Sequence, residues 1–225
     1  MPRLAIIPAR GGSKRLPRKN IRSFHGKPII TYSIETAMNS GLFDEVMVST
    51  DDQEIAEVAK KYGAKVPFFR SENNSSDTAS TLQVIREVLE EYSKLGLKFN
   101  EVCCIYPTAP LIKKEALAAG LDLLDEDIAS VFPAVPFSFP ILRSLKVSED
   151  HFVSMNWPEH SQTRSQDLAP AYHDAGQWYW LRPDLIKDNL YTEKSKVVIL
   201  SELNVQDIDN ESDWKLAEMK YNLIN

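Results

Sequence analysis

The chain has 225 residues, of which 43% are hydrophobic, and its formal net charge at pH 7 is -6. This length and composition are typical of one α/β domain, with or without a small excursion, and they exclude a disordered chain. The acidic balance argues against nucleic acid as a partner, because nucleic-acid binding favours a basic face over the whole domain. The sequence shows no signal peptide and no run of about 18 apolar residues, so we expect a soluble cytoplasmic protein with no membrane partner.

Positive charge gathers around one loop near the start of the chain. The first 34 residues hold eight Lys or Arg residues and no Asp or Glu, so the remainder carries -6 minus 8, or -14. The apolar run 4–7 predicts a buried first strand, and Gly11 and Gly12 follow it among the basic residues. Glycines let backbone N–H groups approach an anion closely, so we predict a polyphosphate cradle at 8–20. The spacings of P-loop and dinucleotide-binding proteins are missing, and a solvated basic loop is the alternative.

Apolar strands alternate with amphipathic helices along the chain, which predicts βαβ units and a mostly parallel sheet. Strands are expected at 4–7, 45–49, 65–69, 102–106, 177–181 and 197–200. Helices are expected at 28–41, 51–63, 80–95 and 211–223, the second opening with a capping box from Asp51 to Glu54. Ligands of such sheets bind beyond the carboxyl ends of the strands, where the basic loop, Asp51, the polar loop after Arg70 and the turn at Pro107 all lie.

The two cysteines, Cys103 and Cys104, are adjacent in the apolar run 102–106 and cannot join distant parts of the fold. They are expected to be buried and reduced, which fits a reducing compartment.

The pattern changes at residue 131. Three prolines in 131–142 make this stretch too rich in proline for a central strand, and few helix signals follow before residue 170. We therefore expect one domain over residues 1–225, with 134–170 as an excursion from the sheet that carries a partner surface. An irregular loop packed fully on the same chain is the alternative.

Two carboxylates precede the last predicted helix. In extended backbone, Asp207 and Asp209 point to the same face while Ile208 points to the core, so the pair is a candidate site for Mg²⁺. The alternative is structural, because Asp209 or Asn210 can cap the helix, and both roles can coexist.

Two arginines and one histidine are further candidates. Arg143 and Arg164 lie among polar residues, and arginine forks suit a substrate carboxylate, although each can equally be an ordinary surface arginine. His173 and Asp174 precede Gly176 and are expected to orient a hydroxyl or to act as a base, with a satisfied turn as the alternative.

Several motifs, taken in order, resemble the CMP-sialic acid synthetase (acylneuraminate cytidylyltransferase) family, which activates sialic acids and related nonulosonic acids with CTP. The resemblance extends from residue 4 to residue 222. Within this family, Tyr172 to Gly176 together with Gln166 to Leu168 most resemble the pseudaminic acid cytidylyltransferases. The motifs are PARGGSKRLPRKN at 8–20, STD at 49–51, SDTAS at 76–80, YPTAPL at 106–111 and DID at 207–209.

The resemblance implies a Rossmann-like nucleotidyltransferase fold and a homodimer in which the excursion is a dimerisation arm that completes the neighbour's site. It implies catalytic roles for Lys19 and Arg10, with Mg²⁺ on Asp207 and Asp209. The implied nucleotide-binding residues are Arg10, Gly11, Gly12, Ser13, Lys19, Asn20, Arg70, Asp77 and Ser80. The implied sugar-binding residues are Tyr106, Arg143, Arg164, His173, Asp174 and Gln177.

Two departures from the family concern the sugar. Sialic acid enzymes have Gln where this chain has Tyr106, and Asn-Gly where it has Asp174-Ala175-Gly176. The expected reaction is transfer of CMP from CTP to a nine-carbon α-keto acid sugar, with pseudaminic acid as the first candidate. Legionaminic acid, N-acetylneuraminic acid and a deoxy-octulosonic acid are alternatives, and a non-catalytic nucleotide-sugar sensor is an alternative of another class.

Overall fold

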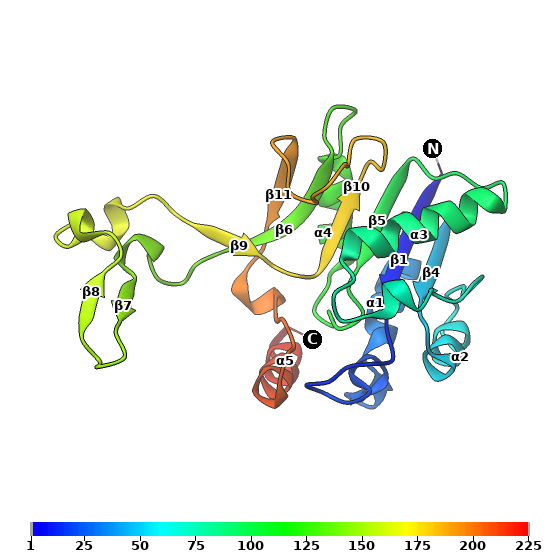
Figure 1. The fold of residues 1–225 in the computed structure, drawn as a ribbon, viewed down its shortest axis with the longest axis horizontal. Helices are drawn as coiled ribbons and strands as arrows, with labels where there is room; N and C mark the ends of the chain where they lie inside the picture. Colours follow the sequence, from blue (N-terminus) through cyan, green and yellow to red (C-terminus); the bar gives the residue numbers. More distant parts are fainter. Residues whose placement is uncertain (1, 225) are drawn as a thin grey trace.

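A mixed sheet forms the centre of the protein in the computed structural model, which describes residues 2–224 (Figure 1). Its order is β11-β6-β10-β5-β1-β4, and β9 pairs with β6 beside this path. Strand β1 is parallel to β4 and β5, and β11 is parallel to β6, whereas β10 is antiparallel to both neighbours. The strands are β1 (Arg3–Pro8), β4 (Glu45–Ser49), β5 (Glu101–Ile105), β6 (Ser130–Pro136), β9 (Tyr172–Asp174), β10 (Trp178–Leu181) and β11 (Ser195–Ile199).

Strand β1, which lies between β5 and β4, is apolar on both faces because both faces are covered. Along β1, Leu4 and Ile6 pack into one core, and Ala5 and Ile7 pack into the other. All four side chains are fully buried, as expected for a strand of a two-sided sheet. The predicted α/β fold and its first strand are confirmed.

Helices cover the two faces unequally. Helices α1, α2 and α4 contribute to one core, and α3 contributes to the other. Helix α5 packs instead in a separate aromatic cluster with the chain that follows the basic loop. None of the helices within residues 2–224 is long and apolar enough to cross a membrane. The helices are α1 (Ile30–Ser40), α2 (Gln53–Lys61), α3 (Thr81–Lys94), α4 (Lys114–Asp122) and α5 (Glu211–Ile224).

Helix α1 begins later than predicted, since Pro28 pairs in the small hairpin of β2 (Ser23–Phe24) and β3 (Lys27–Pro28). Helix α2 is capped by Asp52, whose Oδ1 accepts from the N–H of Ile55 at 3.0 Å. Asp51 lies outside the helix. The predicted helices at 80–95 and 211–223 are confirmed, and α4 was not predicted.

Two predictions about strands are wrong: the strand expected at 65–69, and the expectation that the proline-rich stretch 131–142 forms no central strand. Residues 65–69 form only an isolated bridge between Lys65 and Met47. Residues 130–136 form β6, an inner strand, despite their prolines. The reason is that β10 pairs with β6 at Ser130 and Val131 and β9 pairs with it from Ala134 onward. Pro133 lies where one partner ends and the other begins, so its missing N–H costs no ladder bond on that side.

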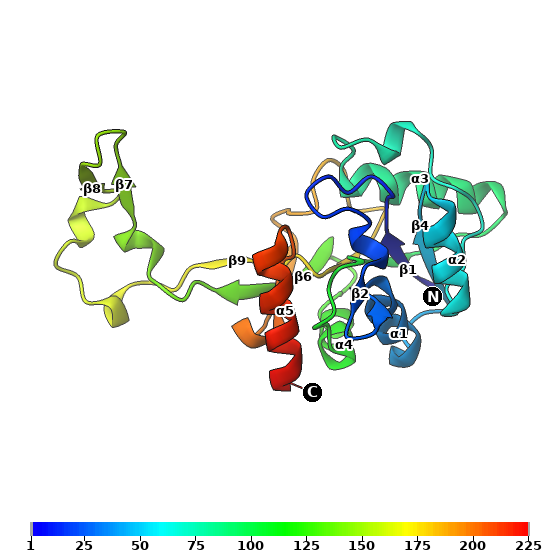
Figure 2. The ribbon, with the colours of Figure 1, turned by 90° about the horizontal axis from the view of Figure 1, so that it is seen from below.

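Residues 137–171, called the arm here, leave the sheet between β6 and β9 and project away from the body in both views (Figures 1 and 2). The arm holds the hairpin of β7 (Leu145–Val147) and β8 (Val153–Met155). Its two ends are joined where the N–H of Phe137 donates to the carbonyl of Ala171 at 2.9 Å. Large apolar side chains are exposed on it, with Phe139 84% and Phe152 77% exposed. The arm is therefore not a loop packed on its own chain.

Candidate functional site

A cavity of about 680 Å³ lies where β1 and β5 end. Pro8 closes β1, Tyr106 follows β5, and the segment before α5 supplies the wall opposite. This is the edge of the sheet at which the sequence predicts a ligand. The predicted site residues that line it are Arg10, Ser13, Lys19, Asn20, Arg70, Asp77, Tyr106, Asp207 and Asp209.

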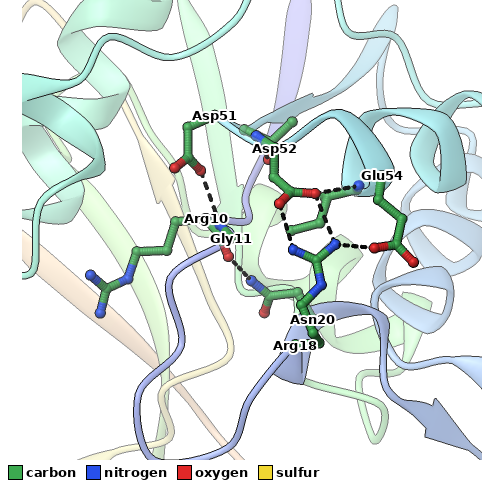
Figure 3. A network of polar contacts seen from close by, with 9 residues as sticks. Arg10, Gly11, Arg18, Asn20, Asp51, Asp52 and Glu54 are labelled. Atoms are coloured by element: carbon green, nitrogen blue, oxygen red, sulfur yellow. Dashed lines mark hydrogen bonds and ion pairs between the residues drawn. The ribbon is translucent and has the colours of Figure 1, made fainter.

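Backbone and side-chain contacts fix the start of the basic loop (Figure 3). The N–H of Gly11 donates to Asp51 Oδ1 at 3.0 Å, and Asn20 Nδ2 donates to the carbonyl of Arg10 at 2.9 Å. A Cβ at Gly11 would lie 2.6 Å from Asp52 Oδ2, so only glycine fits this close approach. A Cβ at Gly12 would meet nothing within 4 Å, so that position faces open space.

The far end of the basic loop is anchored by Arg18. Its guanidinium donates to both carboxylate oxygens of Asp52, at 2.5 and 3.0 Å, and to Glu54 at the start of α2 (Figure 3). These bonds hold the pKa of Asp52 below its usual value. Arg18 therefore ties the loop to the body, and other cations of the loop are left to line the cavity.

The cations that line the cavity meet carboxylates from its other walls. Arg10 and Lys14 both pair with Asp77, which lies in the loop before α3. Arg15 donates to both oxygens of Asp209, at 2.9 and 2.7 Å. All of these side chains are at least one third exposed, so each pair adds little to stability. The pairs can be exchanged for an anionic ligand at small cost.

Lys19 occupies a more enclosed position than its neighbours. Its Nζ donates to the carbonyl of Ile208 at 2.5 Å and lies 3.9 Å from Asp209 Oδ1. Burial lowers the pKa of Lys19, although the nearby carboxylates of Asp209 and Asp207 oppose that shift. The side chain, 20% exposed, thus presents a positive charge that is largely withdrawn from solvent, the condition in which charge stabilisation is strongest.

Asp207 and Asp209 share one face of the segment before α5, as predicted. Both line the cavity, and Ile208 between them is fully buried. Burial and the charge of Asp209 raise the pKa of Asp207, an unfavourable pairing that a cation would relieve.

The cap of α5 comes from Asn210, whose Oδ1 accepts from the N–H groups of Ser212 and Asp213 at 2.8 and 3.0 Å. Neither of the two carboxylates is needed for that role. In residues 2–224 there is no group of three or more His, Cys, Asp or Glu side chains able to hold a metal. A pair of carboxylates still fits Mg²⁺, which usually keeps waters and phosphate oxygens as its other ligands.

A second cavity of about 580 Å³ adjoins the first, and Tyr106 and Asp207 line both. His173 and Asp174 line the second cavity, at the end of β9. Asp174 Oδ2 accepts from the hydroxyls of Tyr179 and Tyr191, and its Oδ1 accepts from the N–H of Gly176 at 2.9 Å. The turn predicted as an alternative is present, and it also holds a carboxylate toward the cavity.

The residues of this second cavity that the sequence did not indicate include Tyr179, Tyr191 and Lys220. Burial and the bond to Asp174 raise the pKa of Tyr191 to about 12, so it remains a hydrogen-bond donor. Tyr179 alternates with the core residues Trp178 and Trp180 along β10, which indicates a different face. Tyr191 and Lys220 reach the cavity from far along the chain, and no local pattern identifies them.

Six predicted site residues line neither cavity: two are Gly11 and Gly12, and the other four are Ser80, Gln177, Arg143 and Arg164. Ser80 caps α3, with its Oγ accepting from the N–H of Gln83 at 3.2 Å. The side chain of Gln177 is turned to the carbonyl of Asn204, to which its Nε2 donates at 2.6 Å. Arg143 and Arg164 lie on the arm, where Arg164 pairs with Asp167 at 2.8 Å. Direct contact of these four side chains with a ligand of their own chain is therefore not supported by this geometry.

Comparison with known proteins gives consistent matches over the whole chain. A family model described as Cytidylyltransferase matches residues 4–197. Pseudaminic acid cytidylyltransferase of Campylobacter jejuni is 45% identical over 228 residues, covering 98% of this chain and 97% of that protein. CMP-N,N'-diacetyllegionaminic acid synthase of Legionella pneumophila is 34% identical, covering 96% of this chain and 94% of that protein. A solved CMP:2-keto-3-deoxy-manno-octonic acid synthetase complexed with CTP has a TM-score of 0.72 at 17% identity, covering 99% of both chains, and supports the fold.

The Arg18 and Asp52 contact predicts a pH-dependent stability. Asp52→Asn keeps a helix cap but loses a charged partner, so it should lower the free energy of unfolding by about 1 to 3 kcal/mol near pH 7. Because the folded pKa of Asp52 is depressed below 3.8, this contribution is present above the unfolded pKa and is lost as the pH falls through the folded pKa. Urea unfolding between about pH 3 and 7 measures the difference.

The difference in the free energy of unfolding between wild type and Asp52→Asn should shrink toward the acid end of that range. In an Arg18→Met background, the free energies of unfolding with Asp and with Asn at residue 52 should differ little at every pH. A gap in the wild-type background that persists undiminished at the acid end would contradict the role given to Arg18.

Proposed function

The chain belongs to the cytidylyltransferase family, and we propose that it transfers CMP from CTP to a nonulosonic acid, with pseudaminic acid as the substrate. The observation that carries the proposal is the pair of adjoining cavities. One is lined by basic side chains, the other holds a fixed carboxylate, and Tyr106 and Asp207 lie between them. Two substrates bound in this way would meet at the shared wall.

The triphosphate of CTP fits the first cavity. Five cations line it against three carboxylates, an excess of two positive charges. Arg10, Lys14 and Arg15 would exchange their carboxylate partners for phosphate oxygens. Arg70, which donates from Nε to Ser49 Oγ at 3.0 Å, and the amide of Asn20 would form the wall for ribose and base.

Chemistry in the proposed reaction takes place at the α-phosphorus. The anomeric hydroxyl of the sugar forms a new P–O bond, the bond to the β-phosphate breaks, and pyrophosphate and a proton leave. Lys19 would stabilise the charge that develops on the α-phosphate, and Arg10 would hold the leaving group. Asp207 and Asp209 would hold Mg²⁺, which when bound neutralises phosphate charge and orients the nucleotide.

The second cavity is the proposed place for the sugar. Tyr106 and the stretch Asp174-Ala175-Gly176 stand where the sialic acid enzymes have Gln and Asn-Gly, so the acceptors and donors offered to the sugar differ from theirs. The C. jejuni relative carries the name pseudaminic acid cytidylyltransferase and the L. pneumophila relative that of a CMP-N,N'-diacetyllegionaminic acid synthase. The higher identity to the former supports pseudaminic acid.

We place the protein in the cytoplasm as a homodimer. Cys103 and Cys104 are both buried and unpaired, which suits a reducing compartment. The arm projects from the body with exposed apolar side chains and carries Arg143 and Arg164. In a dimer these arginines would reach a sugar carboxylate in the partner's second cavity.

Pyrophosphate release tests the proposed function. The purified protein is given CTP and Mg²⁺ with pseudaminic, legionaminic or N-acetylneuraminic acid, each offered separately. Turnover with pseudaminic acid alone is expected. Turnover with another of the three keeps the reaction and replaces the substrate, whereas no release with any of them, together with a thermal shift by CTP that needs no Mg²⁺, would favour a sensor.

Lys19→Ala should lower kcat by about 100-fold or more, because one charge-stabilising donor at the reacting phosphate is removed. Lys14→Ala is the matched control, since the side chain of Lys14 is 80% exposed and pairs with the exposed Asp77. Its expected effect is a higher KM for CTP with a smaller change in kcat. An unchanged kcat in folded Lys19→Ala protein would remove Lys19 from the mechanism.

Mixing of two inactive variants tests whether the arm completes the neighbour's site. Lys19→Ala lacks a residue of the body, and Arg164→Ala lacks one of the arm. A mixed dimer holds one site with both residues intact, so re-assorted protein should recover up to about a quarter of wild-type activity. No recovery, or a monomeric mass by light scattering at micromolar concentration, would contradict the shared site.

A further inference from the structure

The segment from Glu202 to Asp209, called the connecting segment here, runs between the two cavities. It consists of the short turn η6 (Glu202–Asn204) and extended residues up to α5. Glu202, Val205 and Gln206 face the second cavity, Asp209 faces the first, and Asp207 faces both. The position of Asp207 therefore depends on a segment that is not itself part of the sheet.

Side-chain donors hold the carbonyls of the connecting segment. Lys220 Nζ donates to the carbonyl of Val205 at 2.7 Å and to that of Glu202 at 3.0 Å. Gln177 Nε2 donates to the carbonyl of Asn204, and Lys19 Nζ donates to that of Ile208. Donors from three places far apart in the sequence thus hold the connecting segment on both sides of Asp207.

Lys220 differs from an ordinary surface lysine of a helix. Its ammonium is directed at backbone oxygens two to five residues before Asp207. It also lines the second cavity. Burial lowers the pKa of Lys220, although Glu202 opposes the shift, so the charge is partly withdrawn from water. A desolvated ammonium makes stronger hydrogen bonds to carbonyls than an exposed one.

Helix α5, which carries Lys220, is itself firmly held. Trp214 and Ala217 are buried in the aromatic cluster with Phe24. Arg22 donates to both oxygens of Glu211, at 2.6 and 3.0 Å, and lies 4.4 Å above the ring of Trp214. Figure 1 shows the helix directly below the turn that precedes it. The helix is therefore a fixed base from which Lys220 can set the position of the connecting segment.

We propose that Lys220 is a positioning residue for the reaction: by holding the carbonyls of Glu202 and Val205 it fixes Asp207 at the wall between the two substrates. The inference rests on the proposed function, because Asp207 is taken as the ligand side chain at that wall. Groups that orient a ligand side chain are typically worth about 10- to 100-fold in metal affinity or activity. Gln177 acts in the same way through Asn204, and not by contact with the sugar.

Lys220→Met tests the proposal, because it keeps the length of the side chain and removes the charge and the donors. Lys215→Met is the matched control, a lysine of the same helix that lines neither cavity and is exposed. Lys220→Met should lower kcat by about 10- to 100-fold and raise the Mg²⁺ concentration needed for half-maximal rate, with KM for CTP changed by less than about threefold. Lys220→Arg should recover much of the rate, and Lys215→Met should match the wild type.

Amide hydrogen exchange supplies a readout that needs no activity. The N–H of Val205 donates to the same carbonyl of Glu202 that Lys220 holds. Exchange at Asn204 and Val205 should be about tenfold faster in Lys220→Met, while the amides of β1 and β5 exchange as in the wild type. Unchanged β-strand exchange also shows that the variant is folded, and Gln177→Leu gives a second variant with the same expectation.

The outcomes separate the inference from the proposed function. If the wild type turns over none of the sugars, the proposed function fails and this inference fails with it, whatever the exchange data show. If the wild type is active and Lys220→Met keeps its kcat and its Mg²⁺ dependence, the inference alone is overturned. Faster exchange with unchanged kinetics would overturn it too, because Lys220 would then be structural only. Non-additive loss of kcat with Asp207→Asn would support it, since both changes act on one group.

Discussion

Mutual repulsion among the cations of the basic loop is the constraint on which this site depends. The ten residues from Arg10 to Lys19 carry five positive side chains, and one of them, Arg18, anchors the loop to the body. They are accommodated because carboxylates arrive from three separate elements: Asp52 at the start of α2, Asp77 before α3 and Asp209 before α5. Satisfying the charges brings those elements together, and the cavity is the space they enclose.

The pairs are not equivalent, and their exposure divides their roles. Asp52 is the least exposed of the three carboxylates, and it caps the N-terminus of α2 and binds Arg18. Loss of the Arg18–Asp52 ion pair would therefore loosen the loop. The ion pairs of Asp77 and Asp209 are exposed, so replacing these carboxylates by a ligand costs little free energy. A polyphosphate can therefore take over Arg10 and Arg15 without disturbing the anchor that shapes the loop. Asp52 thus stabilises the structure of the loop, whereas Asp77 and Asp209 form ion pairs that a ligand can replace.

Local patterns accounted for much of the fold, and long-range pairing accounted for what was missed. The apolar run 4–7, the capped helix after Ser80 and the alternation around Asp207 each determine their structure within a few residues. Strand β6 could not be predicted, since whether Pro133 is tolerated depends on where β10 and β9 pair with it. Lys220 and Tyr191 were missed for the same reason, because their partners lie at residues 202–205 and at residue 174. Membership of the cytidylyltransferase family was recognisable from ordered motifs that no single stretch carries.

The proposed sugar site in the second cavity is the reason for the role that we propose for the arm. A sugar acid brings a carboxylate that must meet a positive charge once it is removed from water. Lys220 is the cation that lines this cavity among the described residues, and it already donates to two backbone carbonyls. Lys19 and three other loop cations, Arg10, Lys14 and Arg15, line the neighbouring cavity, where the phosphates would need them. Arg143 and Arg164 lie on the arm and line neither cavity of their own chain. Within residues 2–224, the sugar carboxylate in the proposed site therefore lacks a free cation of its own chain, and the arm of a second copy is the source that we propose for it.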